Sequence, residues 1–238
     1  MKRLGLGALA GALLFFSGIA AADGIAVHPI RLELDPGQRT ASMTVTNNAA
    51  ETKVLQVSVT QWKQVNGESV YEPASDVIAT PVLFRIPPKS RQLVRVGFAN
   101  PPAEIATERS YRIYLTEVPE DKGDDGQVRF LLRLGIPLFF PPANAQDSLD
   151  WQLSRQADGK LRLSAENRGN RHVRLQGIRL EDSHGTLVEL QELNYLLPGN
   201  RKQWLLAPER TLTDGKPVKI KAHTGRGMLE AEIPPGVR

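Results

Sequence analysis

The sequence contains no cysteine. This absence excludes disulfides, a thiol nucleophile and a thiolate ligand for a metal ion. Oxidising compartments permit disulfides but do not require them, so the absence does not argue against export. A chain of 238 residues is also long enough to bury a stable apolar core without covalent cross-links.

A concentrated basic charge is missing as well. The chain has 30 Lys and Arg residues against 26 Asp and Glu residues, a formal net charge of +4 at pH 7. The basic residues alternate with apolar ones along many segments, whereas a nucleic-acid-binding protein is expected to carry a basic stripe. We interpret them as solvated faces of β-strands and expect no nucleic-acid partner.

Motifs for catalysis, cofactors and metals are also absent from the sequence. The histidines do not pair at metal-ligand spacing, and no Gly-x-Ser-x-Gly nucleophile motif occurs. We therefore predict no enzymatic activity, no cofactor and no metal, and we interpret the histidines as surface or turn residues. These histidines are His28, His172, His184 and His223.

One long apolar run is present, at the N-terminus. Met1-Lys2-Arg3 is positively charged, residues 4–19 are apolar, and Ala20-Ala21-Ala22 provides the small residues that a signal peptidase requires. The run is short for a membrane span, which needs about 20 apolar residues, and the pattern is typical of a secretory signal peptide. We predict a signal peptide at residues 1–22, export to the periplasm, and no membrane insertion after cleavage.

Hydrophobic alternation with a period of two dominates the rest of the chain. Such alternation places one face of a strand in a core and the other in water. Turn-forming pairs such as Asn66-Gly67 and Asp158-Gly159 separate the segments. Many short strands between turns predict β-sandwiches rather than βαβ units. Alternating segments include residues 41–46, 55–59, 94–98, 111–115, 161–163, 173–175 and 178–180.

The chain is divided by a rigid, polar stretch of low strand propensity. Residues 141–147 have the sequence Pro-Pro-Ala-Asn-Ala-Gln-Asp, which is typical of a linker. The linker separates a predicted N-terminal domain, residues 23–140, from a predicted C-terminal domain, residues 148–238. Each piece has a plausible size for a sandwich domain.

The first predicted strand changes phase at His28-Pro29. Residues 25 and 27 are apolar in one phase, and residues 30, 32 and 34 are apolar in the opposite phase. Proline cannot donate a ladder hydrogen bond and marks an edge strand or a bulge. We expect this segment to pair first with one sheet and then with the other.

The segment 127–137 is unusual because large apolar residues share one of its faces. These residues are Val128, Phe130, Leu132 and Leu134. The segment follows an acidic, glycine-rich loop at residues 120–126 and is the last strand before the linker. A last strand is often an edge, and an apolar edge promotes aggregation unless a partner covers it. Two interpretations stay open, a core-facing strand or a strand donated to an incomplete partner domain.

An ordered series of short segments resembles the periplasmic chaperones of the chaperone–usher pilus pathway. Together these segments cover nearly all of the first domain, and their order makes the set specific. They are residues 30–34, 45–47, 78–81, 84–88, 92–96, 108–113, 117–119 and 136–140. The second domain matches mainly through residues 167–172 and 197–199.

The resemblance implies an all-β fold with two immunoglobulin-like β-sandwich domains set at an angle and a cleft between them. It implies that the donor strand 127–137 completes pilus subunits that lack their final strand, through Val128, Phe130, Leu132 and Leu134. The subunit would then pass to an outer-membrane usher. We also expect the free protein to cover this edge by forming a self-capping dimer.

The resemblance also implies two basic residues in the interdomain cleft that anchor the C-terminal carboxylate of the subunit. Arg31 matches the first of them. The second, a lysine in the family, aligns with Pro137, which has neither a charge nor an N–H group. This departure resembles the archaic or alternative branch of the family. Arg95, Arg109 and Arg133 are candidates for the second basic residue, and the sequence does not choose among them.

Two other classes of function remain open. The chain could be a periplasmic carbohydrate- or metal-binding sandwich if its tryptophans formed an exposed stacking platform. Large aromatics in a sandwich are more often core residues. A hydrolase on a β scaffold would need a concave site with converging carboxylates. The tryptophans are Trp62, Trp151 and Trp204.

Overall fold

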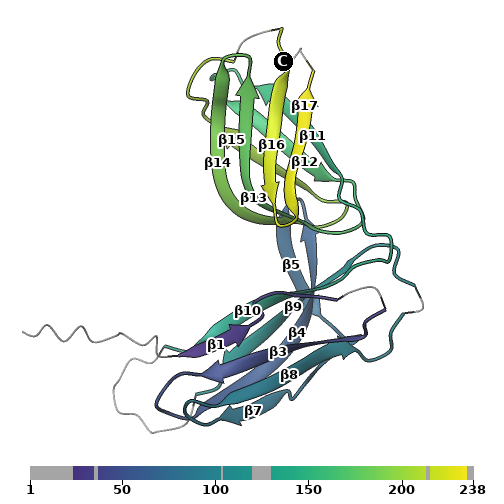
Figure 1. The fold of residues 1–238 in the computed structure, drawn as a ribbon, viewed down its shortest axis with the longest axis vertical. Helices are drawn as coiled ribbons and strands as arrows, with labels where there is room; N and C mark the ends of the chain where they lie inside the picture. The colour runs from purple at the N-terminus through teal and green to yellow at the C-terminus, as the bar shows by residue number, and fades with distance from the viewer. Residues whose placement is uncertain (1–23, 35–36, 103, 120–129, 213–214, 235–238) are drawn as a thin grey trace, which may run out of the picture.

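The computed structural model describes residues 24–34, 37–102, 104–119, 130–212 and 215–234 (Figure 1). The predicted signal peptide 1–22, the loop 120–126 and Val128 lie outside these residues. Within them the secondary structure consists of β-strands. None of the described residues belongs to a helix able to cross a membrane. The fold is therefore all-β, and it forms two sandwiches set at an angle, as the period-two alternation and the resemblance predicted.

The first domain consists of two facing sheets. One has the strand order β1-β3-β8-β6, and the other has the order β2-β10-β9-β4-β5 with β7 also paired to β4. The bounds are β1 (Ile25–His28), β2 (Leu32–Glu33), β3 (Thr40–Asn47), β4 (Lys53–Val65), β5 (Glu68–Pro73), β6 (Val77–Thr80), β7 (Leu83–Ile86), β8 (Arg91–Phe98), β9 (Arg109–Glu117) and β10 (Arg133–Phe140).

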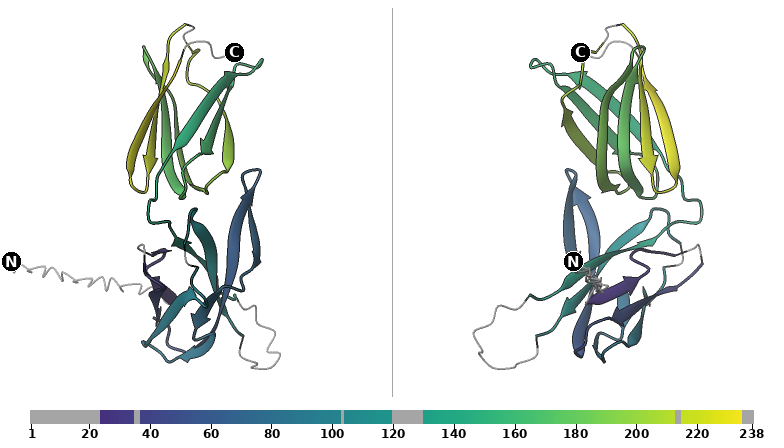
Figure 2. Two further views of the ribbon diagram at one scale, coloured as in Figure 1. Left: turned by 90° about the vertical axis from the view of Figure 1, so that its right-hand side faces the viewer. Right: turned by 60° about the vertical axis from the view of Figure 1, so that its left-hand side comes forward.

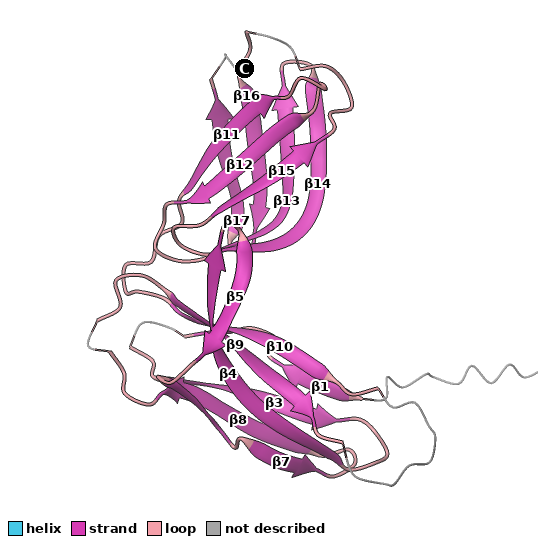
Figure 3. Ribbon diagram, turned by 180° about the vertical axis from the view of Figure 1, so that it is seen from behind, coloured by secondary structure: helices cyan, strands magenta, loops and turns pink. Residues whose placement is uncertain are grey.

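The second domain is a smaller sandwich of two antiparallel sheets, seen from behind in Figure 3. Their strand orders are β11-β12-β15 and β14-β13-β16-β17. The bounds are β11 (Leu149–Arg155), β12 (Leu161–Asn167), β13 (Val173–Asp182), β14 (Gly185–Leu196), β15 (Arg201–Leu206), β16 (Val218–Thr224) and β17 (Gly227–Ile233).

Each sandwich encloses its own apolar core, built from the inward-facing positions of alternating strands. In the first domain, Leu55, Val94 and Ile113 are completely buried. In the second domain, Leu161 and Ile220 are completely buried. Because burial of a large aliphatic side chain contributes about 1.5–3 kcal/mol, these two sets explain why each domain needs no disulfide.

The phase change in the first strand has the predicted consequence. Before His28-Pro29, β1 pairs with β3 in one sheet, with Val27 opposite Val45. After it, β2 runs parallel to β10 in the other sheet, with Leu32 opposite Leu138. The prediction that this segment exchanges sheets is therefore confirmed.

A long hairpin of β4 and β5 rises from the first domain towards the second (Figure 2). Its two-residue turn, Asn66-Gly67, has φ angles of 54° and 83°, as a type I′ turn requires. A Cβ atom on Gly67 would lie 2.9 Å from the carbonyl oxygen of Arg201 in the second domain. Glycine is thus required twice here, for its backbone conformation and for the close approach of the two domains.

A small apolar cluster joins the hairpin to the second domain. Trp62 is 5.9 Å from Phe139 and 5.4 Å from Tyr195, measured between ring centroids. Gln64 donates to the carbonyl of Tyr195 at 2.7 Å, and its own carbonyl accepts from the amide of Leu197 at 2.9 Å. Packing and hydrogen bonds together fix the angle between the domains.

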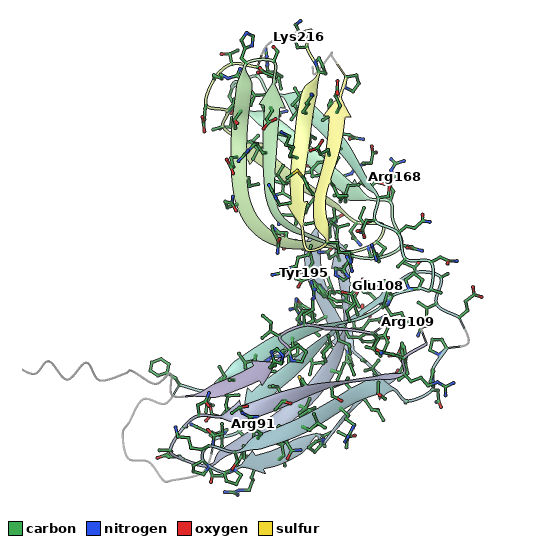
Figure 4. All side chains as sticks on the ribbon, in the orientation of Figure 1. Arg91, Glu108, Arg109, Arg168, Tyr195 and Lys216 are labelled. Carbon is green, nitrogen blue, oxygen red and sulfur yellow. The ribbon has the colours of Figure 1, made fainter. Side chains whose placement is uncertain are left out.

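A buried ionisable pair, Glu108 and His172, crosses the same junction, where Figure 4 labels Glu108 and Tyr195. Nδ1 of His172 lies 2.9 Å from each carboxylate oxygen of Glu108, and the His172 amide donates to Oε1 at 3.0 Å. Both side chains have 0% exposure, and the imidazole stacks on Phe139 at 3.7 Å. Our interpretation of His172 as a surface or turn residue is wrong, because the two domains close over it.

Candidate functional site

The end of the first domain carries a partly unpaired edge strand, β10. It pairs with β9 along its whole length, but with β2 only at Leu138 and Phe139. No other described strand covers the free side of residues 133–137. Just before β10, the amide of Glu117 donates to the carbonyl of Leu132 at 2.8 Å. The chain therefore presents an open edge along residues 133–137.

The regular strand differs in its bounds from the predicted donor strand 127–137. It begins at Arg133 and continues to Phe140, because β2 pairs at residues 138 and 139. The inward side chains of Ile136, Leu138 and Phe140 also extend the strand into the core. Residues 127–129 lie outside the described part of the chain.

The predicted donor residues lie in different surroundings. Phe130 is 92% exposed, and its neighbour Leu131 is 53% exposed. Leu132 is half-buried, and Leu134 packs against the core of its own domain. Exposed apolar surface is therefore concentrated at the start of the segment, where the two sheets no longer enclose it. Monomeric proteins rarely leave such apolar edges without a partner.

Arg31 and Pro137 lie side by side on the face of this sheet that points away from the core of the first domain, where Pro137 is buried. Arg31 directly precedes Leu32, which is opposite Leu138 in the parallel pair of β2 and β10. On the other side of Pro137, β9 places Arg112 directly opposite it. Arg31, just before β2, thus lies in one row with Pro137 on β10 and Arg112 on β9, and we call these three residues the basic row.

Arg112 is held in this row by aromatic side chains. Its Cζ atom lies 4.3 Å from the ring centroid of Trp62 and 5.8 Å from that of Tyr71. One Nη donates to the Tyr71 hydroxyl at 3.3 Å and the other to the carbonyl of Gly135 at 3.5 Å. Neither Arg112 nor Arg31 has a carboxylate partner among the residues that the structure describes. Their charges are therefore available to an anion.

The candidates proposed from sequence for the second basic residue lie elsewhere. Arg95 points outward from the other sheet, beyond the core of the sandwich. Arg109 is in the inward register of β9, with its guanidinium 3.2 Å from Asp76 and over Phe98. Arg133 shares the face of the basic row, but it lies four residues before Pro137 on the same strand.

Asp76, the partner of Arg109, also contacts Tyr111. The Tyr111 hydroxyl donates to Oδ2 of Asp76 at 2.6 Å. Burial, and then the hydrogen bond to this carboxylate, raise the pKa of Tyr111 above its ordinary value. This cluster closes one end of the first sandwich, so Arg109 serves the packing of its own domain.

Sequence reasoning did not identify Arg112. The alternation around it already indicated an outward side chain, because Tyr111 and Ile113 are apolar inward neighbours. The sequence does not reveal the register of β9 against β10. That register decides whether Arg112 lies opposite Pro137 or opposite another residue. A shift of one residue would have turned it to the opposite face.

Within the described residues, the tryptophans do not form the exposed platform that the carbohydrate-binding alternative requires. Trp62 and Trp204 are buried at 4% and 8% exposure. Trp151 is half-buried and stacks on Trp204 at 6.5 Å. Across the described ranges, no three His, Cys, Asp or Glu side chains gather as metal ligands. These tryptophans are core residues rather than a stacking platform.

Two sandwiches at an angle, with an apolar edge strand and a basic row beside the junction, define a two-domain β-protein built to present a strand edge. The family described as "Pili and flagellar-assembly chaperone, PapD N-terminal domain" matches residues 24–146, just over half of the chain. The chain belongs to this family.

Individual relatives agree with this assignment. The chain is 27% identical over 134 residues to the "Probable fimbrial chaperone LpfB" of Escherichia coli O157:H7, and spans about half the length (55%) of that relative. Its fold is similar to the CsuC–CsuE chaperone–tip adhesion subunit complex of Acinetobacter baumannii, with a TM-score of 0.65, 19% identity, and coverage of 88% of this chain and 96% of that one. The fold is also similar to that of the class 5 fimbriae chaperone CfaA, with a TM-score of 0.62 and 16% identity. This match covers 90% of this chain and 100% of that chain.

Proposed function

We propose that this protein is a periplasmic chaperone that folds and caps pilus subunits and delivers them to an outer-membrane usher by donor-strand complementation. The observation that carries the proposal is the open edge of β10, preceded by the exposed side chain of Phe130. Family membership supports it, as does a structural neighbour described as a chaperone bound to a tip adhesion subunit. The protein needs no cofactor and no catalytic residue for this function.

The open edge supplies two kinds of interaction to an incomplete sandwich. Main-chain groups of residues 133–136 pair with a subunit strand, as in other cases of β-strand addition. Val128, Phe130, Leu132 and Leu134 fill the groove of the subunit. Burial of each large apolar side chain contributes about 1.5–3 kcal/mol, so these residues dominate affinity. Leu134 already packs in its own domain, so we expect it to contribute least.

The basic row fixes the register of the donated strand. We propose that Arg31 and Arg112 hold the C-terminal carboxylate of the subunit beside Pro137, with Arg133 further along the same face. A charge-assisted contact to a fixed point prevents the one-residue slip that would turn every apolar donor away from the groove. In the absence of a subunit, we propose that two copies cover each other through β2 and the edge of β10.

The replacement Leu132→Asp is expected to abolish subunit capture, because it places a charge in an apolar groove. The measurement is co-purification from the periplasm of cells that express this chain with neighbouring secreted genes. The matched control is Leu131→Asp, which adds the same charge to the adjacent residue on the opposite face. Equal capture by wild type and Leu132→Asp would overturn the donor assignment, and no partner for any variant would overturn the chaperone function.

The replacement Arg112→Gln is expected to weaken subunit binding about tenfold, because it removes one charge-assisted contact. Arg31→Gln should have a similar effect. Arg109→Gln is the control, since that residue is committed to Asp76. Affinities are compared by competition between tagged variants for one purified subunit. If Arg109→Gln and Arg112→Gln weaken binding equally, the basic row is not the anchor.

A further inference from the structure

An arginine at the start of β10, Arg133, is held in place on the face of the sheet that points away from the core. Its Cζ atom lies 4.1 Å from the ring centroid of Tyr114, on β9. Tyr114 in turn packs edge-on against Tyr71, with 6.1 Å between the ring centroids. A cation over an aromatic ring is attracted by the electrons of the ring. The guanidinium of Arg133 is therefore positioned before any partner arrives.

The absence of a side chain at Gly135 makes this arrangement possible. Gly135 lies directly opposite Tyr114 in the register of β9 and β10. A Cβ atom built on Gly135 would lie 3.2 Å from Cε1 of Tyr114 and 3.3 Å from Cδ of Arg112. Both distances are shorter than an ordinary contact between carbon atoms, which begins at about 3.5 Å. Glycine therefore lets both side chains lie over β10, and a larger residue would push them aside.

The charge of Arg133 is not neutralised within the described part of the chain. Its side chain is exposed, and it forms no ion pair with a described carboxylate. Glu117, which lies opposite Leu132 at the end of β9, is bound by Lys53 at 2.8 Å. An exposed and ordered cation of this kind is complementary to an acidic group on a partner.

Arg133 also belongs to the open edge of β10, where a second strand can be added. The carbonyl of Phe139 accepts from the amide of Leu34 at 3.0 Å, on the side of β2. Because main-chain groups alternate between the two sides of an antiparallel strand, residues 133, 135 and 137 direct theirs toward the same side. A strand added here pairs with these residues, and directly opposite side chains then share one face of the sheet. The residue paired with Arg133 therefore lies beside its guanidinium.

We propose that Arg133 selects its partner by pairing with an acidic side chain of the added strand. This inference rests on the proposed function, under which the strand belongs to a pilus subunit and ends beside Pro137. Arg133 and Pro137 are four residues apart on the same face, a distance of about 13 Å along a strand. One carboxylate cannot contact both places. The acidic side chain is therefore a separate contact, four residues before the residue beside Pro137, and subunits that carry it are the preferred clients.

Reversal of the charge on each partner tests this pair. The probe is the subunit that co-purifies with the wild-type chain, and capture is compared by competition between tagged variants. Arg133→Glu is expected to weaken capture about tenfold, whereas Arg95→Glu, the same change on the other sheet, should leave it unchanged. Lysine is then placed at each acidic residue of the subunit's last strand in turn. One lysine variant should restore capture by Arg133→Glu and weaken capture by the wild type, which loss of a merely structural role would not produce.

Substitution of Tyr114 provides an independent check. Tyr114→Phe keeps the ring under Arg133 and should retain capture, whereas Tyr114→Leu should weaken it. If Arg133→Glu captures the subunit as well as wild type while capture still depends on Leu132, only the acidic pairing is wrong. Failure of every lysine variant to restore capture would also overturn it. If neither wild type nor any variant captures a subunit, the proposed function fails and the pairing fails with it.

Discussion

Replacing Glu108 by alanine is expected to lower the free energy of unfolding by about 3–5 kcal/mol, because it leaves a buried imidazole without its partner. Three contacts would be lost at once, two to Nδ1 and one to the amide of His172. Among the described residues, Nε2 of His172 has no hydrogen-bond partner. The ring would then be buried between two domains with no polar contact.

The same substitution should also loosen the angle between the domains. The backbone amide of Glu108 still donates to the carbonyl of Asn170 at 2.8 Å, and the contacts of Gln64 with the second domain persist. The domains should therefore remain attached but sample more orientations. Subunit binding should weaken as well, because Arg31 of the basic row lies beside Gly225 of the second domain.

Urea denaturation and small-angle X-ray scattering measure these two effects. Glu104→Ala is the matched control, because it removes the same charge from an exposed position just before β9. Glu108→Gln keeps the shape and one acceptor, so its stability should fall between the two. A Glu108→Ala protein as stable and as compact as Glu104→Ala would show that the pair does not hold the domains.

The sequence predicted the architecture because period-two alternation is a local property. In Leu55–Val59 and in Tyr111–Leu115, the alternation of residues along the strand is enough to indicate which face is buried, whatever the neighbouring strands are. The exchange of sheets at His28-Pro29 was predictable for the same reason, since a proline and a change of phase are both visible along the chain.

Contacts between strands and between domains were not predictable in this way. Arg112 belongs to the basic row only through the register of β9 against β10. Arg31 lies beside Gly225 of the second domain only through the angle between the domains. The sequence favours a surface or turn position for His172, because nothing along the chain indicates that Glu108, 64 residues away, is its partner. These contacts depend on how the strands and the two domains pack together, and local sequence patterns do not reveal that packing.

Replacing either of two buried asparagines by alanine is expected to destabilise its own domain by about 2–4 kcal/mol, because several backbone groups lose their partner. Asn47 ends β3, and Asn167 ends β12. Both have 0% exposure. The equivalent positions in the two sandwiches indicate one structural device used twice.

Three side-chain hydrogen bonds of Asn47 have a counterpart at Asn167, and Asn47 also donates to the carbonyl of Pro87 at 3.2 Å. Oδ1 of each accepts the amide two residues ahead, at 2.9 Å in both cases. Nδ2 of each donates to the carbonyl four residues ahead, at 2.7 Å for Asn47 and 2.8 Å for Asn167. Nδ2 also donates across the sandwich, to the carbonyl of Ile86 at 3.0 Å or of Leu196 at 2.8 Å.

Each asparagine therefore closes a turn and ties it to the proline-containing turn of a neighbouring strand. Alanine removes both functions, and aspartate is expected to be worse, because its carboxylate would face two carbonyl oxygens. Hydrogen exchange measures the loss of stability in each domain separately. Asn48→Ala is the control, because Asn48 is next to Asn47 but only half-buried. The two losses should add, since the sites lie in separate cores.

The functional consequences should differ between the two variants. Asn47→Ala loosens the sandwich that carries β10 and the basic row, so it should reduce both stability and subunit capture. Asn167→Ala loosens the second domain, which carries neither β10 nor the basic row, so capture should fall less. A stronger loss of capture in Asn167→Ala than in Asn47→Ala would place the main subunit contact in the second domain, contrary to the donor-strand proposal.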